Sequence, residues 1–212
     1  FHDVYKKFNI VDIFPEITTE KLMLFSDTQT CSNYLIENNY LAVRVTDVFI
    51  KEELAGRIYS SAKNKCSKTV LEEVENAKQH FPLIWVNLRS HNKSWTSQTE
   101  GYANIINKLY EDYPKIGVVF DGSPSEEVIM DQIVNLIPST IATYNAIGDV
   151  YKSIVWAHAI DTYIAVVGSG LTLVTWIANK PGVAHSETAH LSQQLFWSEV
   201  RENAVPPVFI HK

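Results

Sequence analysis

YIAVVGSGLTLVTWIANKPGVAH, from Tyr163 to His185, contains the complete signal of a strand, a glycine turn, a helix and a second strand. β-Branched and aromatic residues lead into Gly168-Ser169-Gly170, an apolar helical pattern follows, and Pro181 ends it before another short strand pattern. Apolar runs without alternation are typical of parallel strands that helices cover on both faces. The stretch therefore predicts one βαβ unit of a parallel sheet.

The same alternation continues upstream to Pro82. Two of the predicted helices begin with capping-box spacing, Ser97 with Glu100 and Ser123 with Glu126. The predicted strands are residues 82–90, 115–122, 139–145, 162–168 and 182–186, the last being the final strand, and the predicted helices are residues 97–113, 123–137, 148–159 and 170–180. Strict alternation of this kind predicts an α/β fold with a doubly wound, Rossmann-like parallel sheet.

The first eighty residues have a different pattern, with strands predicted over 21–27 and 39–45 and helices over 51–66 and 69–80. Thr69, followed three positions later by Glu72, is the predicted start of the last of these helices. These elements are too few for a second complete nucleotide-binding domain. We predict a reduced N-terminal α/β region and linker over residues 1–80, and a sheet domain over residues 81–212.

The composition sets limits on the class of protein. The chain has 212 residues, 46% of them hydrophobic, which is enough for a substantial core, and its net charge of −6 includes no basic stripe. Nucleic acid is therefore not an expected partner. Cys31 and Cys66 have neither metal-ligand spacing nor the density of a disulfide scaffold, which predicts free thiols and a cytoplasmic location.

The long apolar segment 154–178 is the one place where a membrane span needs to be considered. His158, Asp161, Gly168 and Gly170 interrupt it, whereas a spanning helix needs about 20 uninterrupted apolar residues. We expect a helix, a strand and a second helix there instead. The chain begins at Phe1 without a signal-peptide pattern, which indicates a fragment or trimmed chain.

Ligands of doubly wound sheets bind beyond the carboxyl ends of the strands. The polar loops expected at that edge, and expected to face a common crevice, are residues 89–97, 121–125, 144–149 and 168–170. In the last of these loops Gly168 and Gly170 would let the backbone approach a ligand, while Ser169, Leu171 and Thr172 would open the next helix with free N–H groups. A tight turn needed only for packing is the equal alternative.

The loop that follows the strand at 82–90 carries Arg89, His91 and Lys93. Cations at this edge would neutralise a diphosphate, with Arg89 able to bind two oxygens at once and Lys93 acting as a point charge. Solvated surface charge is the alternative. Trp95 could stack on a flat ligand or pack against the core.

Four residues of the other two loops are candidates for contacts with a base or a sugar: Asp121, Gly122, Tyr144 and Asn145. Asp121 ends a buried strand and would accept hydrogen bonds from sugar hydroxyls, or else only cap its loop. His158 and Asp161 lie three positions apart and are expected to form a structural pair. No catalytic-triad, phosphate-loop or metal-ligand motif occurs in the sequence, and neither does the complete dinucleotide fingerprint.

The order of these motifs resembles the C-terminal donor-binding domain of GT-B glycosyltransferases, especially bacterial lipopolysaccharide heptosyltransferases and related polysaccharide transferases. The resemblance covers residues 82–185 and consists of an Arg-x-x-x-Lys-x-Trp loop, a strand ending in Asp-Gly-Ser, and a Gly-Ser-Gly helix start followed by Asn-Lys-Pro-Gly. It implies that Lys93 and residues 168–172 contact the diphosphate of the donor.

The resemblance also implies a reaction and its partners. A sugar would pass from a nucleotide sugar, which is a co-substrate, to a glycan or lipid-linked glycan, with no further cofactor, no metal and possible peripheral membrane association. The acceptor site and catalytic base would come from a missing N-terminal domain or a partner subunit. No base is assigned in this chain; Asp47, Glu52 and His91 remain open.

Two alternatives remain open. The sequence VNLRSHNK, residues 86–93, distantly resembles the basic loop that holds GDP-fucose in fucosyltransferases of GT-B type. The other alternative is a non-catalytic nucleotide-sugar-fold module that serves in complex assembly. Gly168 and Leu173 stand where the heptosyltransferase-like motif has an acidic residue and a histidine, which favours this second alternative.

Overall fold

The computed structural model describes residues 10–16, 23, 25–40, 49–91 and 94–211. Its chain divides into two compact units, Phe1–Phe49 and Ile50–Lys212. The unit that contains the sheet therefore begins well before residue 81, and the two helices predicted over 51–66 and 69–80 belong to it.

The first unit contains two described helices, α1 (Ile10–Ile13) and α2 (Thr28–Glu37). Asp27 caps α2, because its Oδ1 atom accepts the backbone N–H of Thr30 at 2.7 Å. Hydrogen bonds from the backbone and hydroxyl of Thr30 lower the pKa of Asp27 to about 2. The described residues of the strand predicted over 21–27, which are 23 and 25–27, form no strand, and Asp27 caps α2 instead, so that prediction is wrong. Residues 41–45 of the strand predicted over 39–45 lie outside the described residues.

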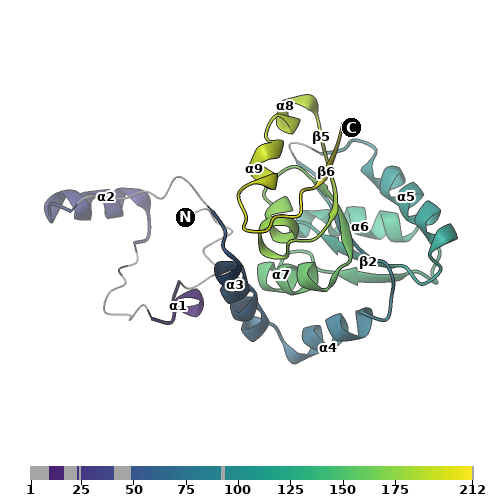
Figure 1. The fold of residues 1–212 in the computed structure, drawn as a ribbon, viewed down its shortest axis with the longest axis horizontal. Coiled ribbons are helices and arrows are strands. Elements are labelled where there is room, and N and C mark those ends of the chain that lie inside the picture. The colour runs from purple at the N-terminus through teal and green to yellow at the C-terminus, as the bar shows by residue number, and fades with distance from the viewer. Residues whose placement is uncertain (1–9, 17–22, 24, 41–48, 92–93, 212) are drawn as a thin grey trace. The chain divides into compact units, whose positions relative to one another are not determined.

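Within the described residues of the second unit, six parallel strands form one sheet in the order β3-β2-β1-β4-β5-β6 (Figure 1). The strands are β1 (Leu83–Asn87), β2 (Gly117–Asp121), β3 (Ala142–Asn145), β4 (Thr162–Val166), β5 (Gly182–Ser186) and β6 (Val208–His211). This confirms the predicted Rossmann-like parallel sheet. The prediction that β5 is the last strand is wrong: β6 is short and partly exposed, so it lacks the buried apolar run that marks the other strands.

Helices cover both faces of this sheet (Figure 1). α5 packs against α6 on one face, and α3, α4, α7 and η4 pack together on the other. The helices are α3 (Glu52–Lys65), α4 (Lys68–Ala77), α5 (Gln98–Asp112), η3 (Pro124–Glu126), α6 (Glu127–Val134), α7 (Val150–Ala159), η4 (Leu173–Ile177), α8 (Thr188–Leu191) and α9 (Gln194–Ser198).

Two of the three predicted helix starts need correction. α4 is capped by Ser67, whose hydroxyl accepts the N–H of Val70, and not by Thr69. Ser97 precedes α5 without forming a side-chain capping bond, because its φ of −101° and ψ of 32° differ from the extended backbone of a capping residue. The third start is confirmed, since Glu126 accepts the backbone N–H of Ser123 and closes the box.

The core occupies both faces of the central strands. Even-numbered side chains of β1 and β2, such as Val86 and Phe120, join Tyr102 and Ile106 of α5 in one buried cluster. Odd-numbered side chains such as Trp85 are equally buried, beneath the helices of the other face. Each of these strands is buried over its full length, so polar residues can appear only where a strand ends.

The predictions for the apolar segment 154–178 and for the two cysteines have structural counterparts. No described helix has both the length and the apolar character that a membrane crossing requires. The segment 154–178 instead contains the end of α7, β4 and η4, as predicted. Cys31 and Cys66 are both free thiols.

Replacement of Ile106 by alanine tests the cluster between β1, β2 and α5. Ile106 is completely buried, so the substitution should lower the free energy of unfolding by about 2–5 kcal/mol. Val128 on α6 is 63% exposed, and Val128→Ala should change it by less than about 0.5 kcal/mol. Urea denaturation of both variants measures this; equal effects would show that the cluster is misplaced.

Candidate functional site at the carboxyl edge

The strand order creates a switch point between β1 and β4. From β1 the chain proceeds outward to β2 and β3, whereas β4, β5 and β6 follow in the opposite direction. The loops after β1 and β4 therefore leave the sheet side by side, and such crevices are where open α/β sheets bind ligands. Arg89 and the glycine turn predicted from the sequence belong to these two loops.

Arg89 and Gly168 are in close contact at this point. A Cβ atom on Gly168 would lie 3.3 Å from Nη1 of Arg89, so the guanidinium occupies the space that the missing side chain leaves. Both residues are at least partly buried. The structure thus brings together the cation and the turn that the sequence predicted separately.

Gly170 makes a similar close approach to Asn87, the last residue of β1. A Cβ atom on Gly170 would lie only 2.8 Å from Nδ2 of Asn87, nearer than real Cβ contacts come. Neither glycine of the turn has a positive φ; among described glycines that conformation belongs to Gly148. The glycines are therefore needed for the close approach of two side chains from the β1 end.

Some of the backbone N–H groups of the glycine turn, residues 168–170, are not used in hydrogen bonds with described residues. The N–H groups of Leu171, Thr172 and Leu173 donate to the carbonyls three residues earlier, and the hydroxyl of Thr172 donates to the carbonyl of Ser169 at 2.6 Å. No described residue accepts the N–H of Ser169 or Gly170. The side chain of Ser169 is exposed and that of Leu171 is buried, so this turn offers two backbone donors and one hydroxyl.

Two side chains fix the loop after β1. The Gln98 side chain makes two hydrogen bonds to the backbone of Arg89. Its Oε1 accepts the Arg89 N–H at 3.2 Å, and its Nε2 donates to the Arg89 carbonyl at 2.6 Å. Glu126 accepts the N–H and the hydroxyl of Ser90, at 2.9 and 2.6 Å. Burial raises the pKa of Glu126, but the hydrogen bonds from Ser90 and Ser123 outweigh it and leave the pKa below its ordinary value.

Asp121 lies beneath this loop system. Its carboxylate is buried and accepts the hydroxyl of Ser153 at 2.7 Å and the amide of Asn87 at 3.1 Å. Burial raises the pKa of Asp121 to about 7, against hydrogen bonds that lower it. Since these partners already surround it, Asp121 supports the strand ends and does not project toward a ligand. The adjacent Gly122 accepts the N–H of Gly148 at 3.0 Å, which joins the loops after β2 and β3.

The other sequence candidates lie in different places. Tyr144 packs against Trp156 of α7, with ring centroids 4.8 Å apart, and so faces the helical layer. Asn145 accepts the N–H of Ile147 at 2.8 Å and shapes its own turn. Trp95 packs edge-on to Tyr102 at 5.3 Å, beside the core. Lys93 lies outside the described residues.

A buried relay of hydrogen bonds adjoins the site. Tyr102 donates to the carbonyl of Asn87 at 3.1 Å and meets Nε2 of His185, on β5, at 2.9 Å. Both bonds form when Nε2 carries the proton. Asn87, Gln98, Glu126 and His185 were not predicted from the sequence as functional positions, although Asn87 carries the same signal as Asp121, a polar residue ending a buried strand.

One further sequence prediction is wrong, and two of the three open candidates for a base can be placed. His158 and Asp161 do not pair: His158 contacts the carbonyl of Ile154 at 3.0 Å, and Asp161 accepts the N–H of Leu83 at 2.7 Å. Of the open candidates for a base, Glu52 is bound by Arg201, His91 is exposed in the loop after β1, and Asp47 lies outside the described residues. Among described side chains, no three metal-ligating groups are clustered.

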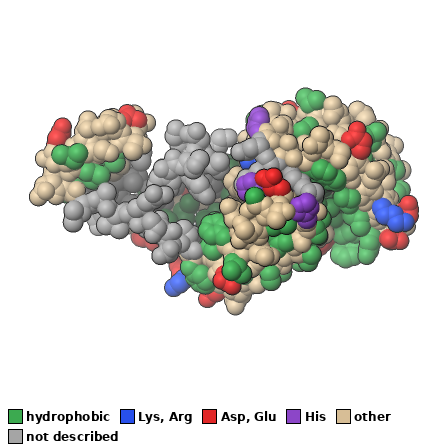
Figure 2. All heavy atoms as spheres, turned by 90° about the horizontal axis from the view of Figure 1, so that it is seen from above, with side chains coloured by type: hydrophobic (Ala, Val, Ile, Leu, Met, Phe, Trp, Pro, Cys, Tyr) green, Lys and Arg blue, Asp and Glu red, His purple; other side chains and the backbone are tan. Residues whose placement is uncertain are grey.

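The visible face in Figure 2 carries mixed side-chain types. Lysine and arginine side chains are scattered singly over its coloured atoms and are not gathered in a stripe.

No protein-family model matches the chain, and no curated protein matches its sequence. Among solved structures, the chain is similar to a glycosyl transferase family 9 protein from Veillonella parvula, with 16% identity, a TM-score of 0.42, and coverage of 63% of this chain and 34% of that one. It is also similar to the N-terminal domain of trehalose-6-phosphate phosphatase from Candida albicans, with 13% identity, a TM-score of 0.44, and coverage of 74% and 38%. The chain thus spans little more than a third of either structure. Its own sheet order and helical layers define it as a Rossmann-like α/β protein.

Asp121→Asn tests the buried carboxyl. An acid whose folded pKa is about 7, against an ordinary 3.8, binds more protons when folded, so stability falls as pH rises from about 4 to about 7. The slope from this group is at most about 1.4 kcal/mol per pH unit. Urea denaturation between pH 5 and 8 should show the wild-type chain losing stability relative to Asp121→Asn. Parallel pH profiles would contradict the raised pKa.

Proposed function

We propose that the switch point binds the diphosphate of a nucleotide sugar, and that the chain is the donor-binding half of a glycosyltransferase. The observation that carries the proposal is the contact of the Arg89 guanidinium with Gly168, beside the N–H groups of Ser169 and Gly170, which no described residue accepts. One fixed cation and adjacent backbone donors form the kind of site that anionic oxygens require.

The same groups suit the chemistry of donor cleavage. Negative charge grows on the diphosphate as the bond between sugar and phosphate breaks, and prepositioned donors stabilise that charge without reorganising. Gln98 and Glu126 hold the Arg89 loop from two sides, which supports such prepositioning. Lys93, four residues beyond Arg89 in the same loop, is proposed as a second cation for the diphosphate.

The acceptor half requires a further proposal. We assign the glycan or lipid-linked acceptor and the catalytic base to another domain or partner subunit. The resemblance of the motif order to GT-B donor domains supports this division. Within the chain, the loops after β2 and β3, which the Gly122–Gly148 bond joins, are the nearest candidates for base or sugar contacts.

One observation favours the non-catalytic alternative. Asp121 and Glu126, the two carboxyl groups described in detail at this edge, are both buried and occupied by hydrogen bonds. A nucleotide-sugar-binding module without transferase activity needs no free base. The occupied carboxyl groups therefore agree with such a module as well as with the donor-binding half of a glycosyltransferase. Transfer or hydrolysis of a nucleotide sugar by the purified chain would contradict the module.

Titration calorimetry with UDP, GDP, ADP and CMP tests the binding site. One nucleoside diphosphate should bind saturably, and Arg89→Gln should weaken it about 10–100-fold, because a charge-assisted bidentate contact is lost. Lys93→Ala should weaken it as well. Arg57→Gln is the matched control, since Arg57 forms an exposed pair with Glu53 on α3 and should leave the affinity unchanged.

The outcomes separate the alternatives. Preference for GDP would favour the fucosyltransferase alternative over the heptosyltransferase-like one. Failure of all four nucleotides to bind, or unchanged affinity of Arg89→Gln, would overturn the proposed phosphate site and leave the glycine turn with its packing role alone.

A further inference from the structure

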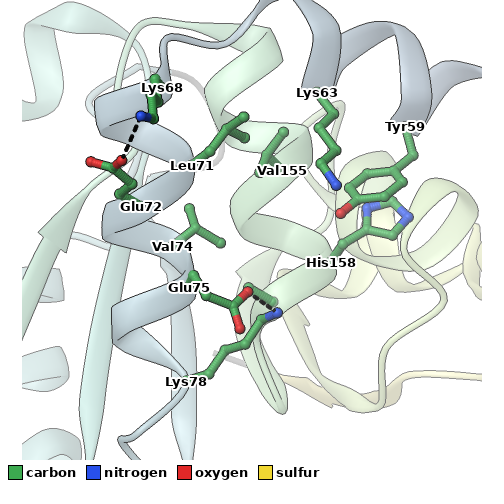
Figure 3. A pocket seen from close by; sticks show the side chains of 11 residues that line it. Tyr59, Lys63, Lys68, Leu71, Glu72, Val74, Glu75, Lys78, Val155 and His158 are labelled. Carbon is green, nitrogen blue, oxygen red and sulfur yellow. Dashed lines mark hydrogen bonds and ion pairs between the residues drawn. The ribbon is translucent and has the colours of Figure 1, made fainter.

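A second candidate site lies among α3, α4 and α7, on the face of the sheet opposite α5 and α6. The described residues enclose a cavity there of about 340 Å³, open on one side (Figure 3). That volume is within the range of small-molecule sites, about 300–1,000 Å³. None of its lining residues belongs to the carboxyl-edge loops, so the cavity is separate from the diphosphate site.

The lysines around the cavity are not equivalent. Lys68 pairs with Glu72 at 3.6 Å, and Lys78 pairs with Glu75 at 2.5 Å, both within α4 and its end. Lys63 of α3 has no carboxylate partner among the described residues. The lining therefore has one positive charge in excess, and this charge is at Lys63.

Two stacked aromatic rings, those of Tyr59 and His158, lie next to Lys63 and carry polar groups. Tyr59 and His158 are stacked, with ring centroids 3.9 Å apart and planes 24° apart. His158 directs Nδ1 to the carbonyl of Ile154 at 3.0 Å, so Nδ1 carries a proton. Burial lowers the pKa of His158, against the hydrogen bond to Ile154 that raises it, and the charges of Lys180 and Arg201 add to the lowering. The net shift favours the neutral ring, in which Nε2 is an acceptor.

Figure 3 shows how these groups converge. The Lys63 side chain extends toward the stacked pair, so that its ammonium group and the phenol oxygen of Tyr59 lie on the same side of the cavity. Neither group has a hydrogen-bond partner among the described residues. Leu71 and Val74 of α4 and Val155 of α7 supply an apolar wall beside them.

We infer that this cavity binds a small organic carboxylate with a flat apolar body. The carboxylate would accept hydrogen bonds from Lys63 and Tyr59, and the apolar body would lie against Leu71, Val74 and Val155. Lys63 is exposed, so water solvates its charge when no ligand is bound; a carboxylate would add a charge-assisted hydrogen bond that a neutral ligand lacks, and a cation would be repelled. This inference is independent of the proposed diphosphate site.

Benzoate is the probe for a test by NMR titration of the isotopically labelled full chain. Increasing benzoate should shift amide signals of α3, α4 and α7 saturably, while benzyl alcohol and benzylamine at the same concentrations should not. Lys63→Gln should weaken benzoate binding at least about fivefold, as loss of a charged hydrogen-bond donor does. Tyr59→Phe keeps the stacked ring, removes the hydroxyl, and should weaken binding to a smaller extent.

Lys115→Gln, at an exposed lysine outside the cavity, is the control for nonspecific charge effects and should bind benzoate as the wild type does. Absence of saturable shifts would overturn the inference. So would equal binding of benzyl alcohol, or equal losses in Lys63→Gln and Lys115→Gln.

Discussion

The buried hydrogen bond between Asn87 and Asp121, 3.1 Å long, ties together the carboxyl ends of the two central strands β1 and β2. Most buried polar groups find hydrogen-bond partners within the fold. Both carboxylate oxygens of Asp121 do so, whereas Oδ1 of Asn87 has no partner among the described residues. Ser153 of α7 donates to the second carboxylate oxygen, and residue 170 must be glycine because the Asn87 amide fills the space of its side chain. One polar pair thereby connects β1, β2, α7 and the turn after β4.

The same pair influences the electrostatics of the switch point. A deprotonated Asp121 would place a negative charge beneath a site proposed for phosphate oxygens, where two like charges repel each other. Burial raises the pKa of Asp121 to about 7, so much of this charge is absent under neutral or mildly acidic conditions. Burial disfavours the ionised form of Asp121, and it therefore also weakens the electrostatic repulsion between Asp121 and an anion bound at the proposed site.

Sequence patterns predicted the sheet well because its strands are buried on both faces, and a short uninterrupted apolar run such as Leu83–Asn87 is typical of a strand in that position. The patterns did not predict β6, because its residues are partly exposed. They also predicted Tyr144 as a ligand contact, although it packs against Trp156, because alternation along a strand does not reveal which face meets α7. The contact of Arg89 with Gly168 depends on the neighbouring positions of β1 and β4. No local sequence pattern reveals that strand order. The sequence therefore predicted Arg89 and Gly168 as site residues separately, but not their contact.

The hydrogen bonds of the glycine turn limit what the turn alone could contribute to the proposed binding of an anion. Residues 171–177 form little more than one and a half turns, η4 is π-helical, and three N–H groups of its start are already used. A short helix with satisfied first donors contributes little of the dipolar attraction found at longer helix ends. Net attraction for an anion would then come mainly from side-chain cations. Arg89 contacts Gly168, and the loop that carries it is held by hydrogen bonds of Gln98 to Arg89 and of Glu126 to Ser90. In the proposed diphosphate site, the turn would supply shape and two backbone donors, while Arg89 would supply the positive charge.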